Sequence, residues 1–349
     1  MSNHKLQPVR GTKDLFGDEI KIFNKIIEIA KNKSCAFGFE ELQTPIFEFS
    51  EVFERNLGES SDIVAKEVYK FPDRGDNFLT LRPEFTAGVV RAFISNGELQ
   101  QVLPKKLFSC GPLFRYERPQ KGRQRQFNQI NFEIFGEDSF YSDVEAILLA
   151  HSILKDLGVL KEVRLEINSL GCAKTKSDYE AALTQYFNQF KNDLSDDSKV
   201  RLEKNPLRIL DSKSAQDIEI LKDAPVIQDF YSDEAKERFD AILQLLTKSG
   251  IDYHVNQRLV RGLDYYTSTV FEFVTNHEGA QNTALAGGRY DGLVEKMSGK
   301  SVPAIGFAAG LERLMLISQL QVEKVRPVTV VYVSDEQKNA AFALTQQII

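Results

Sequence analysis

Two neighbouring segments, about 106–117 and 126–136, constrain this chain most, because both read as long β-strands and a short basic stretch joins them. Side chains of a strand alternate between its two faces. In QFNQINFEIF this alternation separates two sets: Phe127, Gln129, Asn131 and Glu133 on one face, and Ile130, Phe132 and Ile134 on the other. On the preceding strand, Arg115 and Glu117 share a face. The pattern predicts an antiparallel hairpin whose polar face is either solvent-exposed or the floor of a polar pocket.

The stretch between these strands is strongly basic, although the whole chain has a net charge of −6. Its cations are Arg115, Arg118, Lys121, Arg123 and Arg125, opposed only by Glu117. One interpretation is a solvated hairpin loop. The other is a loop that grips phosphate, since clustered guanidinium groups bind phosphate oxygens well and Gly122 lets the loop bend.

Patterns before residue 172 predict a mixture of helices and strands. The expected helices are 18–33, the segment after Pro83, and one that ends near Leu157 and starts at a capping box of Ser142 and Glu145; the expected strands are 39–47, interrupted by Pro45, then 78–82 and 163–168. From about 172 to 253 the chain is polar and has helical periodicity.

Strand character returns after this helical segment, at 267–274, 283–288 and 304–310, with helices following at Asp291 and Leu311. After Pro327 the pattern predicts one strand, VTVVYV, and one helix with a capping box of Ser334 and Gln337. A single strand and helix cannot bury a core of their own, so we interpret them as the start of a further domain.

Several classes of protein do not fit the sequence. No apolar run has the length of a membrane helix, and the first residues lack a signal-peptide core, so we expect a cytoplasmic protein. Cys35, Cys110 and Cys172 are too scattered for a disulfide framework or a zinc site, and we expect reduced, mostly buried thiols. The chain has no phosphate loop of the GxxxxGK[ST] type and no GxGxxG after a strand. We interpret His151 as a core or boundary residue rather than a catalyst.

Three segments resemble the motifs of class II aminoacyl-tRNA synthetases. FRYERPQKGRQRQF (114–127) is similar to motif two, and GFAAGLERL (306–314) is similar to motif three. FGFEELQTPIFE (37–48) resembles the looser motif one, which this class uses at its dimer interface.

Three further segments narrow the resemblance to histidyl-tRNA synthetases. LVRGLDYYTSTVFEF (259–273) and ALAGGRYDGLV (284–294) resemble the signature pair of that family, and TLRPEFTAG (80–88) resembles its amino-acid-binding segment. The resemblance implies an aminoacyl-tRNA ligase that activates L-histidine with ATP to histidyl-adenylate and transfers it to the 3′ end of tRNA(His). It also implies an α+β fold: a class II core with a mostly antiparallel sheet flanked by helices.

With this resemblance the chain divides into four parts. Residues 1–171 are the first part of the catalytic core and 172–253 a helical insertion domain. Residues 254–322 complete the core, and 327–349 begin a truncated α/β anticodon-binding domain. The missing remainder puts anticodon reading by this chain in doubt, though not adenylation.

The resemblance also assigns residues to ATP. Arg115 would hold the α-phosphate and Arg123 the outer phosphates, while Phe127 and Arg313 would enclose the adenine. Glu117 would accept a hydrogen bond from the adenine amino group or support Mg²⁺, which we expect to enter with ATP rather than in a dedicated protein cage.

Further residues are implied for histidine. Arg261 would bridge the histidine carboxylate and the α-phosphate, and with Arg115 it forms the expected catalytic pair. The remaining histidine-binding positions are Glu84, Phe85, Thr86, Gln129, Glu133, Tyr265, Tyr266 and Tyr290. Among these, Glu133 and Tyr266 would contact the imidazole, and Glu84, Thr86 and Gln129 the α-ammonium group. Tyr265 and Tyr290 are alternatively core packing, and Phe85 stands where many relatives have glycine.

The expected partners follow from the same resemblance. Gln120 and Arg125 would contact the acceptor end of the tRNA, and a homodimer would form through the strand containing Pro45, with helix 18–33 nearby. Two alternatives remain: a synthetase-like regulatory subunit of ATP phosphoribosyltransferase, which also lacks the anticodon domain, and a non-enzymatic RNA-binding module.

Overall fold

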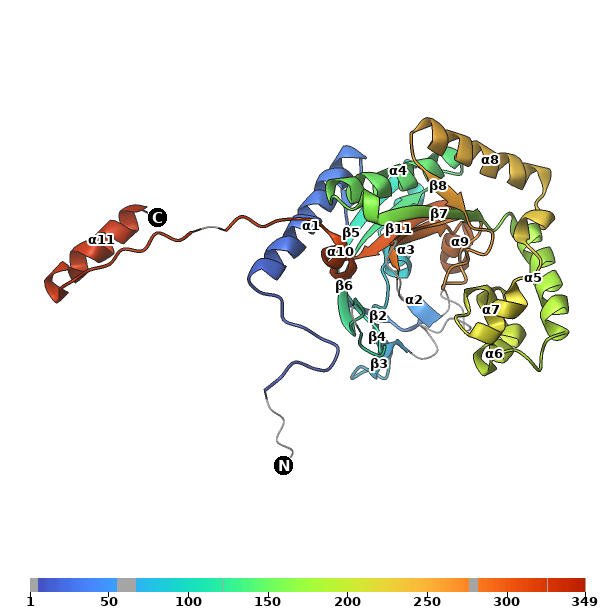
Figure 1. Cartoon of the computed structure of the whole chain (residues 1–349), viewed down its shortest axis with the longest axis horizontal. Coiled ribbons are helices and arrows are strands. Elements are labelled where there is room, and N and C mark those ends of the chain that lie inside the picture. Colours follow the sequence, from blue (N-terminus) through green and yellow to red (C-terminus); the bar gives the residue numbers. More distant parts are fainter. Residues whose placement is uncertain (1–5, 55–66, 121, 276–281, 325, 349) are drawn as a thin grey trace, which may run out of the picture.

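The computed structural model describes residues 6–54, 67–120, 122–275, 282–324 and 326–348, and its centre is an eight-stranded sheet (Figure 1). In spatial order the strands are β1 (Glu40–Glu41), β5 (Lys105–Phe114), β6 (Gln126–Phe135), β11 (Ala304–Gly310), β10 (Thr283–Arg289), β9 (Thr269–Thr275), β7 (Val163–Ser169) and β8 (Tyr253–Val255). Among the described strands of this sheet, only the edge pairs β1–β5 and β7–β8 are parallel. The predicted, mostly antiparallel sheet is confirmed.

The β5–β6 hairpin forms the longest ladder, with Leu107 opposite Glu133 and Phe114 opposite Gln126. The predicted alternation is confirmed, because Ile130, Phe132 and Ile134 are buried in a core beneath helices. The predicted end of the first strand at residue 117 is wrong. β5 ends at Phe114, and the next pairing runs from the Arg115 N–H to the carbonyl of Arg125, where the connecting loop begins.

Helices cover both faces of this sheet (Figure 1). On one face lie α1 (Asp18–Ala36), α4 (Phe140–Asp156), α8 (Asp233–Lys248) and α10 (Leu311–Ile317), whose apolar side chains join one core with the sheet. On the other face lie α3 (Thr86–Ser95) and α9 (Gly292–Ser298), with the short α2 (Glu51–Glu54). The expected helices at 18–33 and after Pro83 are therefore confirmed.

A small antiparallel sheet lies beside α2 and α3, in the order β2 (Phe47–Phe49), β4 (Phe78–Leu81) and β3 (Tyr69–Pro72). The expected strand over 39–47 is thus split between two sheets, with β1 in the large one and β2 in the small one. Arg82 connects the segment between β1 and β2 to β5, because its guanidinium donates to the carbonyls of Thr44 (2.8 Å) and Pro112 (2.9 Å).

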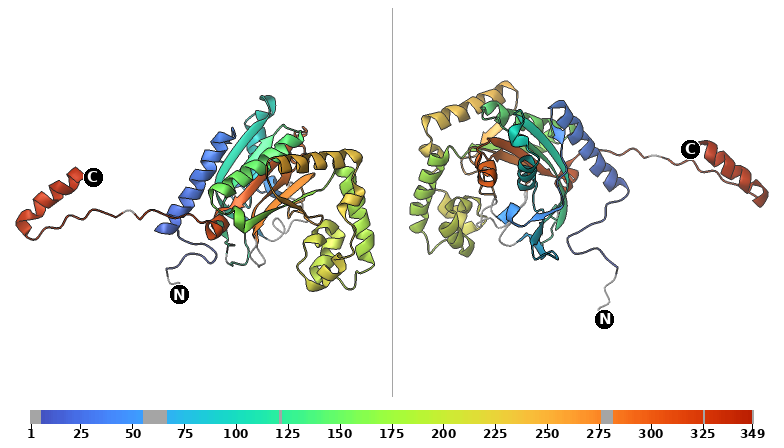
Figure 2. Two further views of the ribbon diagram at one scale, coloured as in Figure 1. Left: turned by 45° about the horizontal axis from the view of Figure 1, so that its top comes forward. Right: turned by 180° about the vertical axis from the view of Figure 1, so that it is seen from behind.

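Residues 173–248 form a run of helices beside the sheet (Figure 2). The run contains α5 (Ala173–Asn188), α6 (Asp196–Lys204), η4 (Pro206–Asp211), α7 (Ala215–Leu221), η5 (Ile227–Phe230) and then α8. Tyr179, Leu183 and Phe187 of α5 are buried in the cluster that also holds Tyr265 and Tyr290. The division of the chain into domains stays a prediction.

Three local expectations are wrong. Ser139, not Ser142, caps α4, because the Ser142 hydroxyl is turned toward the Glu137 and Ser139 carbonyls. Residues 326–333 form no strand, since no described segment lies alongside to pair with them, and α11 (Lys338–Ile348) stands apart from the body with no buried residue (Figures 1 and 2). Cys35 and Cys172 are exposed rather than buried, and all three cysteines are free.

The short helical turns complete the described chain: η2 (Glu98–Gln100), η3 (Leu160–Glu162) and η6 (Asp335–Gln337). Within the described ranges, no helix combines the length and apolarity that crossing a bilayer requires.

A buried ion pair joins the sheet to the helices. Arg289, at the end of β10, is 1% exposed and donates to both carboxylate oxygens of Asp143, which is fully buried near the start of α4. Its remaining donors reach the Glu137 carbonyl, the Ser142 hydroxyl and Asp291. Removing one partner of such a pair leaves an uncompensated buried charge, which is costly even where the intact pair adds little stability.

We expect Asp143→Ala to lower the free energy of unfolding by about 3–5 kcal/mol, because Arg289 and Arg238 both lose the buried carboxylate that they share, and among the described carboxylates only Asp291 remains paired with Arg289. Urea denaturation measures this. The matched control is Asp178→Ala, which breaks the exposed Lys174–Asp178 pair and should leave the urea midpoint unchanged. Equal midpoints for both variants would contradict a stabilising role of the buried pair.

Candidate active site

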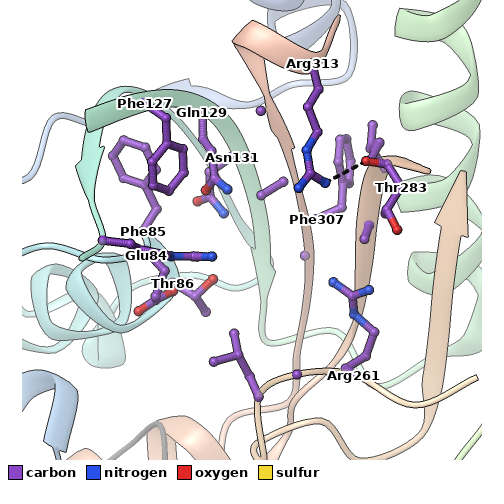
Figure 3. A pocket seen from close by; sticks show the side chains of 18 of the residues that line it. Glu84, Phe85, Thr86, Phe127, Gln129, Asn131, Arg261, Thr283, Phe307 and Arg313 are labelled. Carbon is purple, nitrogen blue, oxygen red and sulfur yellow. Dashed lines mark hydrogen bonds between the residues drawn. The ribbon is translucent and has the colours of Figure 1, made fainter. Parts of the chain in front are cut away.

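A cavity of about 290 Å³ lies on the polar face of the large sheet (Figure 3). Most of the residues singled out from the sequence line it together: Glu84, Phe85, Thr86, Arg115, Glu117, Arg123, Phe127, Gln129, Glu133, Arg261, Tyr265, Tyr266, Tyr290 and Arg313. Gln120 and Arg125 do not line it. Alternation along β6 brings Phe127, Gln129 and Glu133 to this face. The other lining residues come from other strands, helices and loops that meet at the same face.

Glu133 lies at the deep end of the cavity and is 1% exposed. One carboxylate oxygen accepts from the Thr86 hydroxyl (2.6 Å) and the Asn131 amide (2.9 Å), and the other from the Tyr290 hydroxyl (2.5 Å). Burial raises the pKa of Glu133 to about 7, although these hydrogen bonds oppose the rise. Tyr290 is thus a direct hydrogen-bond partner of Glu133, and the expected contact of Glu133 and Tyr266 with an imidazole stays a prediction.

The neighbouring strand β11 must leave room for this carboxylate. Gly306 lies opposite Glu133, and a Cβ atom there would come within 1.6 Å of the carboxylate oxygen Oε2. Any side chain at this position would therefore displace the Glu133 carboxylate from its hydrogen-bond partners. The glycine in GFAAG therefore keeps space at the deep end of the cavity.

Aromatic rings and a helix start form the adjoining wall. The ring centroids of Tyr265 and Tyr266 are 4.7 Å apart, and those of Tyr265 and Tyr290 are 5.5 Å apart. Burial raises the pKa values of all three hydroxyls, so they are neutral donors at physiological pH. Glu84 is buried and caps α3 by accepting from the Ala87 N–H (2.8 Å).

The other end of the cavity is cationic. Arg115 donates to the Pro83 carbonyl (2.8 Å) and its guanidinium lies 5.2 Å from the Phe127 ring centroid. Glu117 faces the Arg123 guanidinium at 2.7 Å and that of Arg115 at 3.9 Å. Burial, then the charges of Arg123 and Arg115, lower the pKa of Arg313. More positive charge is gathered here than Glu117 balances, which suits a polyanion.

Figure 3 places Phe127 and Arg313 on opposite sides of the same end of the cavity, with a gap between them. Arg313 is held in this position by donating to the Thr283 carbonyl (2.8 Å). Arg261 lies on the same side of the view as Thr283, opposite Glu84 and Thr86, and directs its guanidinium toward Thr283 and Arg313. A flat ring between Phe127 and Arg313 would meet one aromatic face and one cation.

Sequence reasoning missed Glu272 and Thr283. Glu272 of β9 forms an ion pair with Arg261, and its second oxygen accepts from the Thr283 hydroxyl (2.8 Å). The available signal was a carboxylate inside the otherwise apolar strand VFEFV. Gly306 was also missed, and Asn131, although placed on the polar face of its strand, was given no role in the site. Within the described residues, no group of three or more His, Cys, Asp and Glu side chains could hold a metal ion.

The two residues outside the cavity lie on the loop that follows β5. Gln120 pairs with Arg123 through backbone hydrogen bonds of 3.1 and 2.9 Å, while Lys121 lies outside the described residues. The Arg125 guanidinium covers the Tyr116 ring at 4.0 Å, and the Arg125 N–H donates to the carbonyl of Gly11 (2.7 Å). Gly11 has a φ of +87°, and a Cβ there would meet the Arg125 side chain at 2.7 Å.

Comparison with known proteins gives one consistent family. The sequence matches the family model of histidyl-tRNA synthetase over residues 11–314. It is 53% identical over 342 residues to the histidine–tRNA ligase of Wolbachia pipientis subsp. Culex pipiens, covering 98% of this chain and 83% of that protein. It is 50% identical over 345 residues to the histidine–tRNA ligase of Rickettsia bellii, covering 99% of this chain and 83% of that protein.

A solved structure agrees. The chain superimposes on apo histidyl-tRNA synthetase of S. aureus with a TM-score of 0.79 and 33% sequence identity, covering 98% of this chain and 82% of that one. The fold is therefore that of a class II synthetase core, and these matches favour the synthetase over the regulatory subunit. With motifs two and three and the three histidine-family segments contributing to one cavity, and its relatives aligned over nearly its whole length, the chain belongs to the histidyl-tRNA synthetase family.

Proposed function

We propose that this chain, an aminoacyl-tRNA ligase of that family, activates L-histidine with ATP and transfers it to tRNA(His). The observation that carries the proposal is one cavity with two different ends. One end is the buried carboxylate of Glu133 with its hydroxyl neighbours, and the other gathers Arg115, Arg123 and Arg313 around an aromatic ring.

The first step joins the histidine carboxylate to the α-phosphorus of ATP. A carboxylate oxygen forms the new O–P bond, the bond from the α-phosphorus to the bridging oxygen breaks, and pyrophosphate leaves with the electron pair. Little proton transfer is needed, so fixed positive charge and orientation supply most of the rate. Arg115 and Arg261 both line the cavity, and we assign these two cations to the negative charge that develops around the α-phosphorus.

Histidine would place its imidazole against Glu133 and Tyr266, and its α-ammonium group near Glu84, Thr86 and Gln129. Tyr265 and Tyr290 complete the pocket, and buried Phe85 narrows it. A pocket whose polar groups match both ring nitrogens leaves those groups unpaired with any other amino acid, and such a mismatch costs much affinity.

For ATP, we assign the adenine to the gap between Phe127 and Arg313 and the outer phosphates to Arg123. Mg²⁺ would enter with the triphosphate and neutralise part of its charge. The residues fit an ion carried by the nucleotide, since Glu117 is a single carboxylate already facing two arginines. Glu117 alternatively accepts from the adenine amino group.

The tRNA acceptor end would meet the loop after β5 through Gln120 and Arg125. Neither residue lines the cavity, so we assign them to a partner that binds outside it rather than to ATP. Arg125 also packs on Tyr116 and beneath Gly11, so its contribution would be coupled to the shape of the loop. A cytoplasmic location stays a prediction.

A homodimer is the assembly that we infer from the small sheet. Its register puts one apolar set on a single face: Phe47, Phe49, Leu79, Leu81, Tyr69 and Phe71. Phe47 is 53% and Phe49 is 58% exposed. Both belong to β2, which follows Pro45 in the segment expected at the interface. An apolar face of this kind marks a protein interface more often than free surface.

Arg261→Ala should abolish most histidine-dependent exchange of pyrophosphate with ATP. The guanidinium acts on charge that develops in the transition state, so kcat should fall by about a hundredfold or more while the KM for histidine changes little. Lys191→Ala, which removes an exposed cation outside the cavity, is the control and should keep full activity. An effect confined to KM would contradict the assignment of Arg261, and no exchange by the unaltered chain would contradict the function.

Glu133→Gln and Tyr266→Phe should weaken histidine more than ATP, because each removes a partner of the imidazole and leaves the arginines in place. The pKa of Glu133, near 7, adds a pH test. As pH falls from 8 to 6 the carboxylate gains a proton, so the KM for histidine should rise more steeply in the unaltered chain than in Glu133→Gln. The titration of free histidine is common to both. Parallel profiles, or equal weakening of both substrates, would refute the imidazole assignment.

Phe49→Glu should shift the chain from dimer to monomer in light scattering at micromolar concentration, because a charge in the apolar face opposes its burial. Tyr141→Glu alters an exposed aromatic residue of α4 instead and should leave the dimer intact. A monomeric unaltered chain would rule out the homodimer, and a dimeric Phe49→Glu variant would move the interface elsewhere.

A further inference from the structure

Arg261 and Arg313 approach the cavity from different elements, yet one carboxylate connects them. Glu272 forms an ion pair with Arg261 through one oxygen and accepts from the Thr283 hydroxyl (2.8 Å) through the other. The carbonyl of the same Thr283 accepts from Arg313 Nη1 (2.8 Å). Glu272 and Thr283 therefore link the two guanidinium groups.

Glu272 occupies a position where a carboxylate is costly. Its cross-strand neighbour in β7 is Glu166, so two like charges lie directly opposite each other. Each carboxylate has its own cation: Glu166 contacts Arg164 (2.6 Å), and Glu272 contacts Arg261. Neither carboxylate lines the cavity. The two pairs differ in their cations, because Arg261 lines the cavity and Arg164 does not.

The ion pair leaves part of Arg261 available. Glu272 engages Nη1, while Nε is buried and has no hydrogen-bond partner among the described residues. Burial alone would lower the pKa of Arg261, but Glu272 and the nearby tyrosines hold that pKa above its ordinary value. A flexible arginine side chain loses much rotamer freedom when it is fixed, and a preformed ion pair supplies that fixation before substrate binds.

We propose that Glu272 is a positioning residue for adenylation: with one oxygen held by the Thr283 hydroxyl, it fixes the guanidinium of Arg261, which lines the cavity. This inference rests on the proposed function. Glu272 need not touch substrate, so its loss should lower the rate of the chemical step rather than the affinity for either substrate.

The test is Glu272→Gln, which keeps the shape of the side chain and removes its charge. In histidine-dependent pyrophosphate exchange we expect kcat to fall roughly 10- to 100-fold, because misplacing a catalytic group by a fraction of its contact distance has effects of that order. The KM values for histidine and ATP should stay close to those of the unaltered chain.

Glu166→Gln is the matched control, since it neutralises the opposite carboxylate on the adjacent strand and should retain full kcat. The second readout is a double-mutant cycle. Arg261→Ala combined with Glu272→Gln should be no slower than Arg261→Ala alone, because Glu272 acts only through a group that is already absent. A merely structural role would lower activity again in that background.

Thr283→Val is the second variant. If Glu272→Gln does not fold, the double-mutant cycle is measured with Thr283→Val and Arg261→Ala instead. It releases one oxygen of Glu272 and should give a smaller loss of kcat that also disappears in the Arg261→Ala background. Equal kcat for Glu272→Gln and Glu166→Gln, or multiplicative losses in the double mutants, would overturn the inference. Absence of exchange by the unaltered chain would instead overturn the proposed function.

Discussion

The buried carboxylate of Glu133 is the constraint around which the cavity is organised. A charge in the interior is stable only where donors surround it. Those donors come from separate elements: Thr86 from α3, Asn131 from β6 itself, and Tyr290 from the turn after β10. Gly306 of β11 provides the space. The deep end of the cavity thus exists only when distant parts of the chain have come together.

The large sheet separates this polar region from the apolar core. Ile130, Phe132 and Ile134 pack beneath α1 and α4, while the residues between them face the cavity. Burying one face fixes the register of the strand, because a slip of one residue would exchange the two faces. Stability of the core and orientation of the binding groups therefore depend on the same pairing of β5, β6 and β11.

The alternation in QFNQINFEIF was sufficient to predict both faces of β6, because the side-chain period of a strand is a local property. The motifs likewise predicted which segments meet in the cavity. Glu272 was not predicted, since its importance depends on Arg261 and Thr283, which reach it only through tertiary contacts. The cap of α4 was misplaced because Ser139 and Ser142 are both acceptable N-caps locally. In the structure the Ser142 hydroxyl accepts from the distant Arg289, whereas the Ser139 hydroxyl accepts from the Tyr141 N–H of the helix. The apolar run after Pro327 reads as a strand, but a strand needs a neighbour that the described residues do not supply. The roles within the cavity stay predictions.

Gly11 has a consequence for how the molecule fluctuates. Its carbonyl accepts from the N–H groups of both Arg125 and Gln126, so the segment before α1 is fastened to the base of the loop after β5. The segment before α1 is mostly exposed, and segments with few buried contacts are among the first to open in partial unfolding. When this N-terminal segment detaches, the loop base loses an acceptor for two backbone donors. Local opening at the start of the chain and the order of its most basic loop are therefore one coupled equilibrium.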